Sequence, residues 1–210
     1  MSVAVATCID AGRRILAESE EARLLARCRS GDRQAQEALV RRYQDRTYRL
    51  AYDLLGNHED ALDASQEALV AMLRSLPSFR GEARFHTWFY RLTVNICLMQ
   101  RRRLLTRTRI LTNLAARELD SPSQFDPESA ALGSEIQSAV REHLRQLPPA
   151  LRAIIVLREI EGFSYDEIAE VLRIPLGTVQ SRLSRARSLL RKALLADDRI
   201  PSVRPGGEKP

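Results

Sequence analysis

Residues 163–192 constrain the fold more than any other stretch, because they contain two short amphipathic patterns separated by a tight turn. Ser164 is followed three residues later by Glu167, which is the spacing of a helix-capping box. We therefore expect a helix that begins at Tyr165. The apolar face of this helix is formed by Tyr165, Ile168, Ala169 and Leu172.

A turn and a second helix come after this first helix in the sequence. Pro175 and Gly177 end the first helix, and Thr178 is placed to cap the next one. Apolar residues then recur at helical spacing, at Val179, Leu183, Ala186 and Leu190. The side chains left facing outward are small and polar or basic, namely Gln180, Ser181, Ser184, Arg185 and Ser188. The two patterns together predict a helix-turn-helix.

The second helix lies in a stretch without carboxylates. Between Glu170 and Asp197 there is no Asp or Glu, but there are Arg173, Arg182, Arg185, Arg187, Arg191 and Lys192. A basic helix with small hydrogen-bonding side chains suits the major groove of DNA. The alternative is an ordinary helical hairpin with a solvated face. Such a face usually mixes both signs of charge, so we favour DNA binding.

A second basic stretch lies earlier in the chain. Residues 83–117 lack Asp and Glu but contain Arg84, Arg91, Arg101, Arg102, Arg103, Arg107, Arg109 and Arg117. Interleaved near its start are His86, Thr87, Trp88, Phe89, Tyr90 and Asn95. Guanidinium groups suit a nucleic-acid backbone, rings suit stacking and an amide suits a base edge, so we expect contact with unstacked bases. The alternative is that Trp88 is a core residue, because Leu92 and Ile96 share its helical face.

Composition narrows the class of protein. The chain has 210 residues, a formal net charge of +6 and a sequence pI of about 9.7, which favours an anionic partner. Cys8, Cys28 and Cys97 are far apart and lack ligand spacing, so we expect no metal site and no disulfide framework. No apolar run has the length of a membrane span, and we expect a cytoplasmic protein without direct membrane insertion.

Helical periodicity dominates and strand-like alternation is absent, so we predict an all-α fold with two helical domains joined by a flexible linker. The predicted segments are an N-terminal tail (1–19), a first domain (20–109), a linker (110–134), a second domain (135–196) and a disordered C-terminal tail (197–210). The linker and the C-terminal tail are the segments rich in Pro, Gly, Ser and charge.

Taken together and in this order, residues 60–103 and 147–194 resemble the bacterial RNA polymerase sigma factors of the extracytoplasmic-function (ECF) group. The first stretch contains DALDASQEALVAMLRSLPSFRGEARFHTWFYRLTVN and the second contains EGFSYDEIAEVLRIPLGTVQSRLSRAR. The resemblance covers about residues 24–195. It implies that the first domain is sigma region two and the second is sigma region four. It also implies binding to core RNA polymerase through the β′ clamp helices and the β flap, binding to promoter DNA, and control by an anti-sigma factor.

The resemblance carries roles to individual residues. The D-A-x-D-x-x-Q-E segment that faces the polymerase clamp is matched by Asp60, Asp63, Gln66 and Glu67. The part that captures a flipped minus-ten base is matched by residues 78–85 and the helix that follows, with Arg80, Glu82, Arg84, Phe85, Trp88, Arg91 and Asn95 as candidates. Among these, we expect Trp88 to pack under the loop and hold it in place.

The part that binds the minus-thirty-five element is matched by Thr178, Gln180, Ser181, Arg182, Ser184, Arg185 and Arg187. Of these, we expect Arg182 and Arg187 to hold phosphates. The chain departs from the family pattern at two positions. Gln180 stands where many relatives carry Arg or Lys, which leaves the base preference open. Arg173 stands where the turn often has Gly, and it is strained if that position requires a positive φ.

Two other classes of function compete with this interpretation. The first is a free-standing regulator that uses only the helix-turn-helix, but a sensor domain has no need of the Arg-rich and aromatic stretch. The second is an enzyme, which we do not expect. His58, His86 and His143 are isolated, no catalytic or cofactor motif is present, and we expect no cofactor. The linker acids Asp120, Asp126 and Glu128 suggest a further hypothesis, that the linker docks on the basic helices.

Overall fold

A computed structural model of the chain describes residues 20–81, 83–114, 135–197 and 199–200. Every regular element within these ranges is helical, which confirms the predicted all-α class. The predicted N-terminal tail, Cys8, Glu82, the linker acids and most of the C-terminal tail lie outside the described residues. None of the described helices is both long enough and apolar enough to cross a bilayer.

The first domain is a bundle built on three long helices. They are α2 (Arg33–Leu55), α3 (His58–Ser75) and α4 (Phe85–Leu114), preceded by a short helix at residues 20–29. The hinge between α2 and α3 is formed by Gly56 and Asn57. Gly56 adopts a left-handed φ of 81° and ends α2, and the Asn57 side chain accepts from the amide of Asp60 to start α3. Small residues on α3 allow close packing and are fully buried, namely Ala61, Ala64 and Ala68.

The second domain contains shorter helices: α5 (Glu135–Gln146), α6 (Pro149–Ile155), α7 (Tyr165–Leu172) and α8 (Leu176–Leu195). A π-helical turn (Val156–Ile160) follows α6. The predicted capping box of α7 is confirmed, because Glu167 N donates to Ser164 Oγ and Ser164 N donates to the Glu167 carboxylate. The predicted apolar stripe of α8 is also confirmed, with Val179, Leu183 and Ala186 buried.

Two local predictions are wrong. Thr178 does not cap α8, because the helix begins earlier, at Leu176, after Pro175. Proline at the N-cap has no side-chain acceptor, but its fixed φ of −59° leads the chain into the first turn. The predicted boundary between the first domain and the linker is also wrong, because α4 runs to Leu114 into the segment assigned to the linker (110–134).

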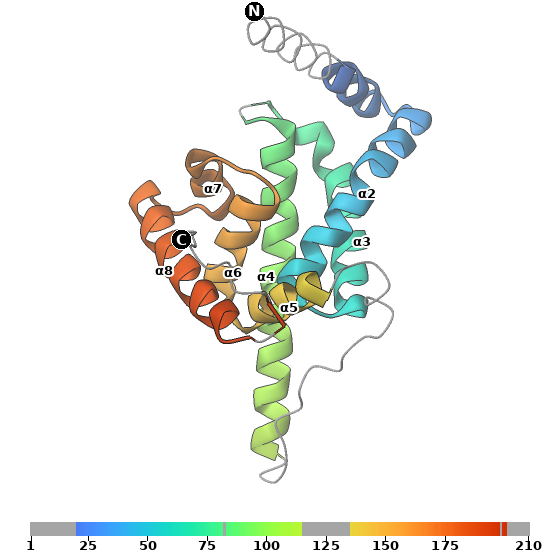
Figure 1. The fold of residues 1–210 in the computed structure, drawn as a ribbon. Coiled ribbons are helices and arrows are strands. Elements are labelled where there is room, and N and C mark those ends of the chain that lie inside the picture. The colour runs from blue at the N-terminus through green and yellow to red at the C-terminus, as the bar shows by residue number, and fades with distance from the viewer. Residues whose placement is uncertain (1–19, 82, 115–134, 198, 201–210) are drawn as a thin grey trace, which may run out of the picture.

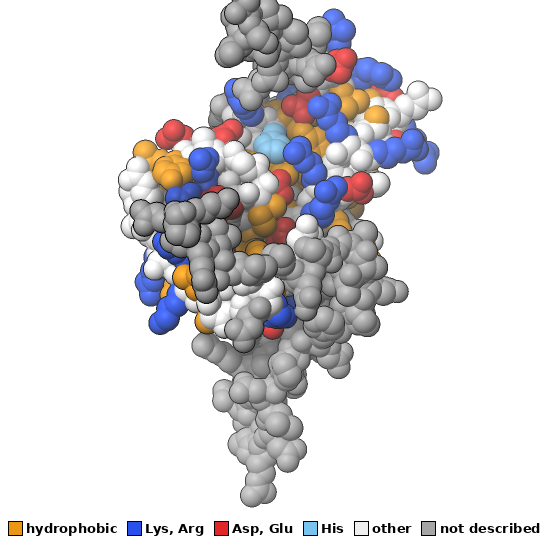
Figure 2. Space-filling model, in the orientation of Figure 1, with side chains coloured by type: hydrophobic (Ala, Val, Ile, Leu, Met, Phe, Trp, Pro, Cys, Tyr) orange, Lys and Arg blue, Asp and Glu red, His pale blue; other side chains and the backbone are white. Residues whose placement is uncertain are grey.

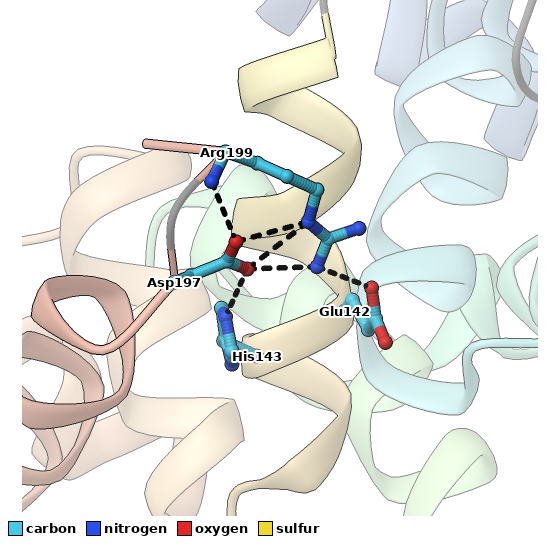
Figure 3. Close-up of polar contacts among 4 residues, drawn as sticks. All are labelled: Glu142, His143, Asp197 and Arg199. Atoms are coloured by element: carbon cyan, nitrogen blue, oxygen red, sulfur yellow. Dashed lines mark hydrogen bonds and ion pairs between the residues drawn. The ribbon is translucent and has the colours of Figure 1, made fainter. Parts of the chain in front are cut away.

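The C-terminal tail predicted to be disordered (197–210) begins at a residue that makes defined contacts in the structure. The His143 ring nitrogen Nε2 lies 2.7 Å from Asp197 Oδ2, and Arg199 Nη2 lies 2.8 Å from Glu142 Oε2 and 2.7 Å from Asp197 Oδ2 (Figure 3). These contacts join the segment after α8 to α5, which α8 also contacts. Bonds from Arg199 and His143 hold the pKa of the Asp197 carboxyl well below its usual range.

The two domains are packed against each other, with α4 in the middle of the molecule (Figure 1). Helices α2 and α3 lie on one side of α4 and α6, α7 and α8 on the other, while α5 crosses in front (Figure 1). Helix α4 contacts α7, and α2 contacts both α5 and α6. Buried residues of both domains therefore form one continuous apolar cluster.

Candidate nucleic-acid interface

The loop before α4 is supported by a cluster of aromatic rings. The Trp88 ring centroid lies 5.0 Å from that of Phe79 in the loop and 5.4 Å from that of Phe85. Phe85 is buried, with 4% of its surface exposed, and meets Tyr43 of α2 edge-on at 5.5 Å. Trp88 therefore packs under the loop, as predicted. Phe85 supports the loop from the core instead of presenting a face to solvent.

Sequence reasoning missed a residue that holds this loop. Arg29, at the end of the N-terminal helix, donates from Nη2 to the carbonyl oxygen of Phe79. Its guanidinium carbon also lies 5.5 Å from the centroid of the Phe79 ring, a cation–π contact. Because these contacts join residues 50 positions apart, no local pattern in the sequence indicates them.

A cavity of about 350 Å³ opens between the loop and α4. Its lining consists of Ser78, Phe79, Arg80, Ala83, Trp88, Arg91 and Glu170. Three of the predicted minus-ten residues, Arg80, Trp88 and Arg91, thus converge on one space. Arg84 and Asn95 do not line it, although both are exposed. Two guanidinium groups beside a ring face can receive an unstacked base and its phosphate.

The outward face of α8 is the second candidate surface. Gln180, Ser181, Ser184 and Arg185 are all exposed, whereas Leu183 on the opposite face is 1% exposed. Figure 2 shows Lys and Arg side chains along α8 at the lower left of the molecule, and also over α2 and the helix before it. The arrangement presents small polar groups and a guanidinium on a convex helix, as major-groove binding requires.

The predicted phosphate contacts of α8 differ in their surroundings. Arg187 donates from Nε and Nη2 to Glu159 Oε1, at 2.9 and 2.6 Å, so its guanidinium is oriented by the π-helical turn. Arg182 is half-buried, and Thr178 lies in the first turn of α8, where its carbonyl accepts from Ser181 Oγ. In the turn before α8, Arg173 adopts φ 52° and ψ 51°, the strained left-handed conformation expected from its departure from Gly.

The face of α3 that carries the predicted polymerase contacts is open. Asp63, Gln66 and Glu67 are exposed, while Asp60 is half-buried and accepts from the Gln100 amide at 3.5 Å. Leu62 and Val70 on the same helix are exposed to 42% and 47%. Two large apolar side chains are therefore exposed on the helix that carries the three exposed polar candidates.

Comparison with known proteins decides the family. Residues 39–107 match the Sigma-70 region 2 family and residues 137–190 match the Sigma-70 region 4 family. The chain is 35% identical to the RNA polymerase sigma-H factor of Pseudomonas aeruginosa over 86% of its own length and 96% of that protein. It is 36% identical to the ECF RNA polymerase sigma-E factor of Haemophilus influenzae, over 80% of this chain and 91% of that one. The chain belongs to the ECF sigma factors.

Solved structures agree with this assignment. The ECF sigma factor described here is similar to the sigma factor RpoE in complex with the anti-sigma factor NepR from Bartonella quintana. The TM-score is 0.63 and the identity 25%, over 77% of this chain and 97% of that one. It is also similar to CnrH in complex with the cytosolic domain of CnrY, with a TM-score of 0.62 and 27% identity, over 83% and 97% of the two chains. As a sigma factor, the protein directs initiation of transcription by RNA polymerase.

Proposed function

We propose that this sigma factor divides its work among three surfaces, each carried by a different helix. The exposed face of α3, with Asp63, Gln66 and Glu67, binds the clamp helices of the β′ subunit of core polymerase. The proposal is supported by the charge of this face, which is acidic within a basic protein and so complements a basic partner. Leu62 and Val70 add the apolar area that such a contact needs.

The cavity between the loop and α4 captures a base of the minus-ten element after it leaves the duplex. Unstacking a base costs a few kcal/mol, and a pocket that stacks and hydrogen-bonds the base offsets that cost. Trp88 and Phe79 form the floor, and Arg80 and Arg91 are placed for the phosphates on either side. This cavity, on the same chain as a basic helix-turn-helix, is the observation that carries the proposal.

The outward face of α8 reads the minus-thirty-five element in the major groove, with Gln180, Ser184 and Arg185 toward the bases. Because Gln180 offers an amide, it is suited to adenine, whereas Arg185 is suited to guanine. Arg182 and Arg187 hold phosphates, and the Glu159 contact fixes the direction of Arg187.

Control by an anti-sigma factor is also part of the proposal. The similar RpoE structure contains the anti-sigma factor NepR, and the similar CnrH structure contains the cytosolic domain of CnrY. We place the protein in the cytoplasm, where RNA polymerase acts. A free-standing regulator is not favoured, because it would leave the α3 face and the cavity without a purpose.

Run-off transcription tests the proposal. Purified core RNA polymerase is supplied with a pool of randomised promoters, with and without this protein, and the transcribed templates are sequenced. We expect initiation that depends on the protein, with two enriched motifs separated by a fixed spacer. Binding to duplex DNA without any initiation would instead support the free-standing regulator.

A further inference from the structure

The loop before α4 is anchored at its amino end by a residue from a different helix. A short 3₁₀ helix, Leu76–Ser78, ends at Phe79, whose amide donates to the Leu76 carbonyl at 3.1 Å. The carbonyl of Phe79 lies beyond this turn and accepts a hydrogen bond from Arg29 Nη2. The guanidinium of Arg29 also makes the cation–π contact with the Phe79 ring. One side chain therefore holds both the backbone and the ring of Phe79.

The backbone contact determines where Arg80 begins. The Phe79 carbonyl and the Arg80 amide belong to one peptide unit, which is planar. A bond that fixes the direction of the carbonyl therefore also fixes the direction in which the chain enters Arg80, a residue that lines the cavity. Gly81, which follows, has a left-handed φ of 77° and adds little restraint of its own. The restraint on Arg80 comes from the Phe79 side.

The ring contact supports the floor of the cavity. The half-buried ring of Phe79 lies 5.0 Å from that of Trp88, and both rings line the cavity. Phe85 meets the Phe79 ring edge-on at 5.6 Å from the core, whereas Arg29 contacts it from the helix at residues 20–29. Arg29 does not line the cavity itself. It therefore acts on the cavity through Phe79.

The helix that carries Arg29 is fixed to α2. Cys28 on this helix is buried, and its carbonyl accepts from Gln36 Nε2 of α2 at 3.3 Å. At the other end of the helix, the Tyr43 hydroxyl of α2 donates to Glu21. The helix at residues 20–29 is thus held to α2 near both of its ends.

The connection between this helix and α2 is equally well defined. The Asp32 side chain caps α2 by accepting from the Ala35 amide at 3.1 Å, and it also accepts from Arg27 Nε at 2.9 Å. The Asp32 amide donates to the Arg27 carbonyl at 3.1 Å. Arg29 lies between these two residues, so its side chain starts from a held backbone. A residue that positions another group needs such a support.

We propose that Arg29 is a positioning residue for promoter melting, which sets Arg80 and the Phe79 ring in the minus-ten cavity without contacting DNA itself. The inference rests on the proposed function of the cavity and deepens it, because it makes the helix at residues 20–29 part of the minus-ten site. A pocket that must first be ordered has less binding energy left to offset the unstacking of a base. Loss of Arg29 therefore weakens melting and leaves the α3 and α8 surfaces unchanged.

The first measurement is made on the free, full-length protein. Trp88 is the only tryptophan of the chain, so intrinsic fluorescence reports on the floor of the cavity. Arg29→Ala should increase the quenching of Trp88 by acrylamide, because the Phe79 ring that covers it loses a support. The matched control is Arg23→Ala, which removes an exposed guanidinium from the same helix at a position that does not line the cavity. Circular dichroism reports whether both variants keep their helices.

The second measurement is made on holoenzyme assembled from core RNA polymerase and each variant. Permanganate footprinting measures melting of the promoter recovered by run-off transcription. Arg29→Ala should lower melting about tenfold, the factor that corresponds to one hydrogen bond from a charged donor. Arg29→Lys keeps a charged donor but not the planar group, so it should restore part of the melting. Arg23→Ala should melt the promoter as the wild type does, and all variants should bind a minus-thirty-five duplex equally.

Salt dependence separates positioning from a direct phosphate contact. Binding of each holoenzyme to a fluorescent single strand that carries the minus-ten motif is measured at several salt concentrations. Loss of one phosphate contact lowers the slope of log affinity against log salt by about 0.7. We expect Arg29→Ala to bind more weakly with an unchanged slope. Arg80→Ala, which removes a guanidinium that lines the cavity, should lower the slope.

Three results would overturn the inference: unchanged quenching in Arg29→Ala, unchanged melting, or weaker binding with a lower slope. Equal losses in Arg29→Ala and Arg23→Ala would also overturn it, because the effect would then follow the charge of the helix. If Arg29→Ala loses its helices, Arg29→Lys decides, since melting below the wild-type level is expected there too. A wild-type holoenzyme that does not melt the promoter refutes the proposed function and this inference with it. Melting by the wild type and equal melting by Arg29→Ala refute the inference alone.

Discussion

The two candidate DNA surfaces of this sigma factor differ in their shape and in the number of elements that form them. The α8 face is a convex helix surface with exposed Gln180, Ser184 and Arg185. The cavity beside α4 is concave, is supported by Trp88 and is also lined by Glu170 of α7. A surface that recognises duplex DNA needs only a helix with suitable side chains. A site that holds an extruded base needs a formed pocket. The pocket is therefore the surface that depends on contacts between distant parts of the chain.

The largest expected effect comes from removing the ring that supports the cavity. Trp88→Ala should destabilise the first domain by roughly 2–4 kcal/mol, because the half-buried ring packs on both Phe79 and Phe85. Urea unfolding measures this loss, and permanganate footprinting measures promoter melting. We expect melting to be abolished while duplex binding at the minus-thirty-five element is retained. Loss of both activities together would show that the two surfaces are not independent.

The pH dependence of stability tests the interface between the domains. Asp53 of α2 lies 3.8 Å from Arg141 Nε of α5, and burial raises its pKa from 3.8 to about 6 despite the charge of Arg141. A raised pKa means that the folded state binds the proton more tightly than the unfolded state does. The stabilisation is therefore fully present below pH 3.8 and is lost as the pH rises through 6.

Asn at this position stays neutral at every pH. Relative to the wild type, Asp53→Asn should gain on the order of 1–3 kcal/mol between pH 4 and pH 7, with no further change above that. Denaturant melts at several pH values give the difference. A constant offset between the two proteins would mean that the carboxyl titrates normally.

A substitution on α8 tests the second candidate DNA surface. Arg185→Ala should weaken binding to a minus-thirty-five duplex by roughly 1–3 kcal/mol, because a bidentate contact to guanine is lost. Fluorescence anisotropy measures the affinity, with Ser188→Ala, also exposed on α8, as the control. An equal loss of affinity with Ser188→Ala would mean that Arg185 makes no specific contact with the duplex.

The smallest expected effect concerns the turn between α7 and α8. Arg173 holds a left-handed backbone with φ 52°, which a side chain disfavours. Arg173→Gly should stabilise the second domain by up to about 1 kcal/mol, which calorimetry detects as a rise in Tm. The affinity of α8 for its duplex should not change. A fall in affinity would assign Arg173 to DNA binding rather than to the turn alone.

Much of the fold is determined by the sequence over short distances. The capping box at Ser164 and Glu167, the Gly56 break and the stripe of Val179, Leu183 and Ala186 all depend on residues within a few turns of one another. Caps and periodicity act through local hydrogen bonds and helix geometry, so they can be predicted without knowing the rest of the molecule. The start of α8 was misplaced because Thr178 and Pro175 both suit a helix terminus.

The tertiary structure alone decided how the surfaces are combined. Arg29 holds Phe79 across 50 positions, and Arg152 reaches the Leu54 carbonyl across 98. Neither pair has a periodic or compositional signature, since each depends on where whole helices come to rest. Sequence could therefore indicate that the chain carries a minus-ten surface and a minus-thirty-five surface. Only the tertiary structure decided that Glu170 of α7 also lines the cavity of the first surface, whereas the side chains of the second surface lie exposed on α8.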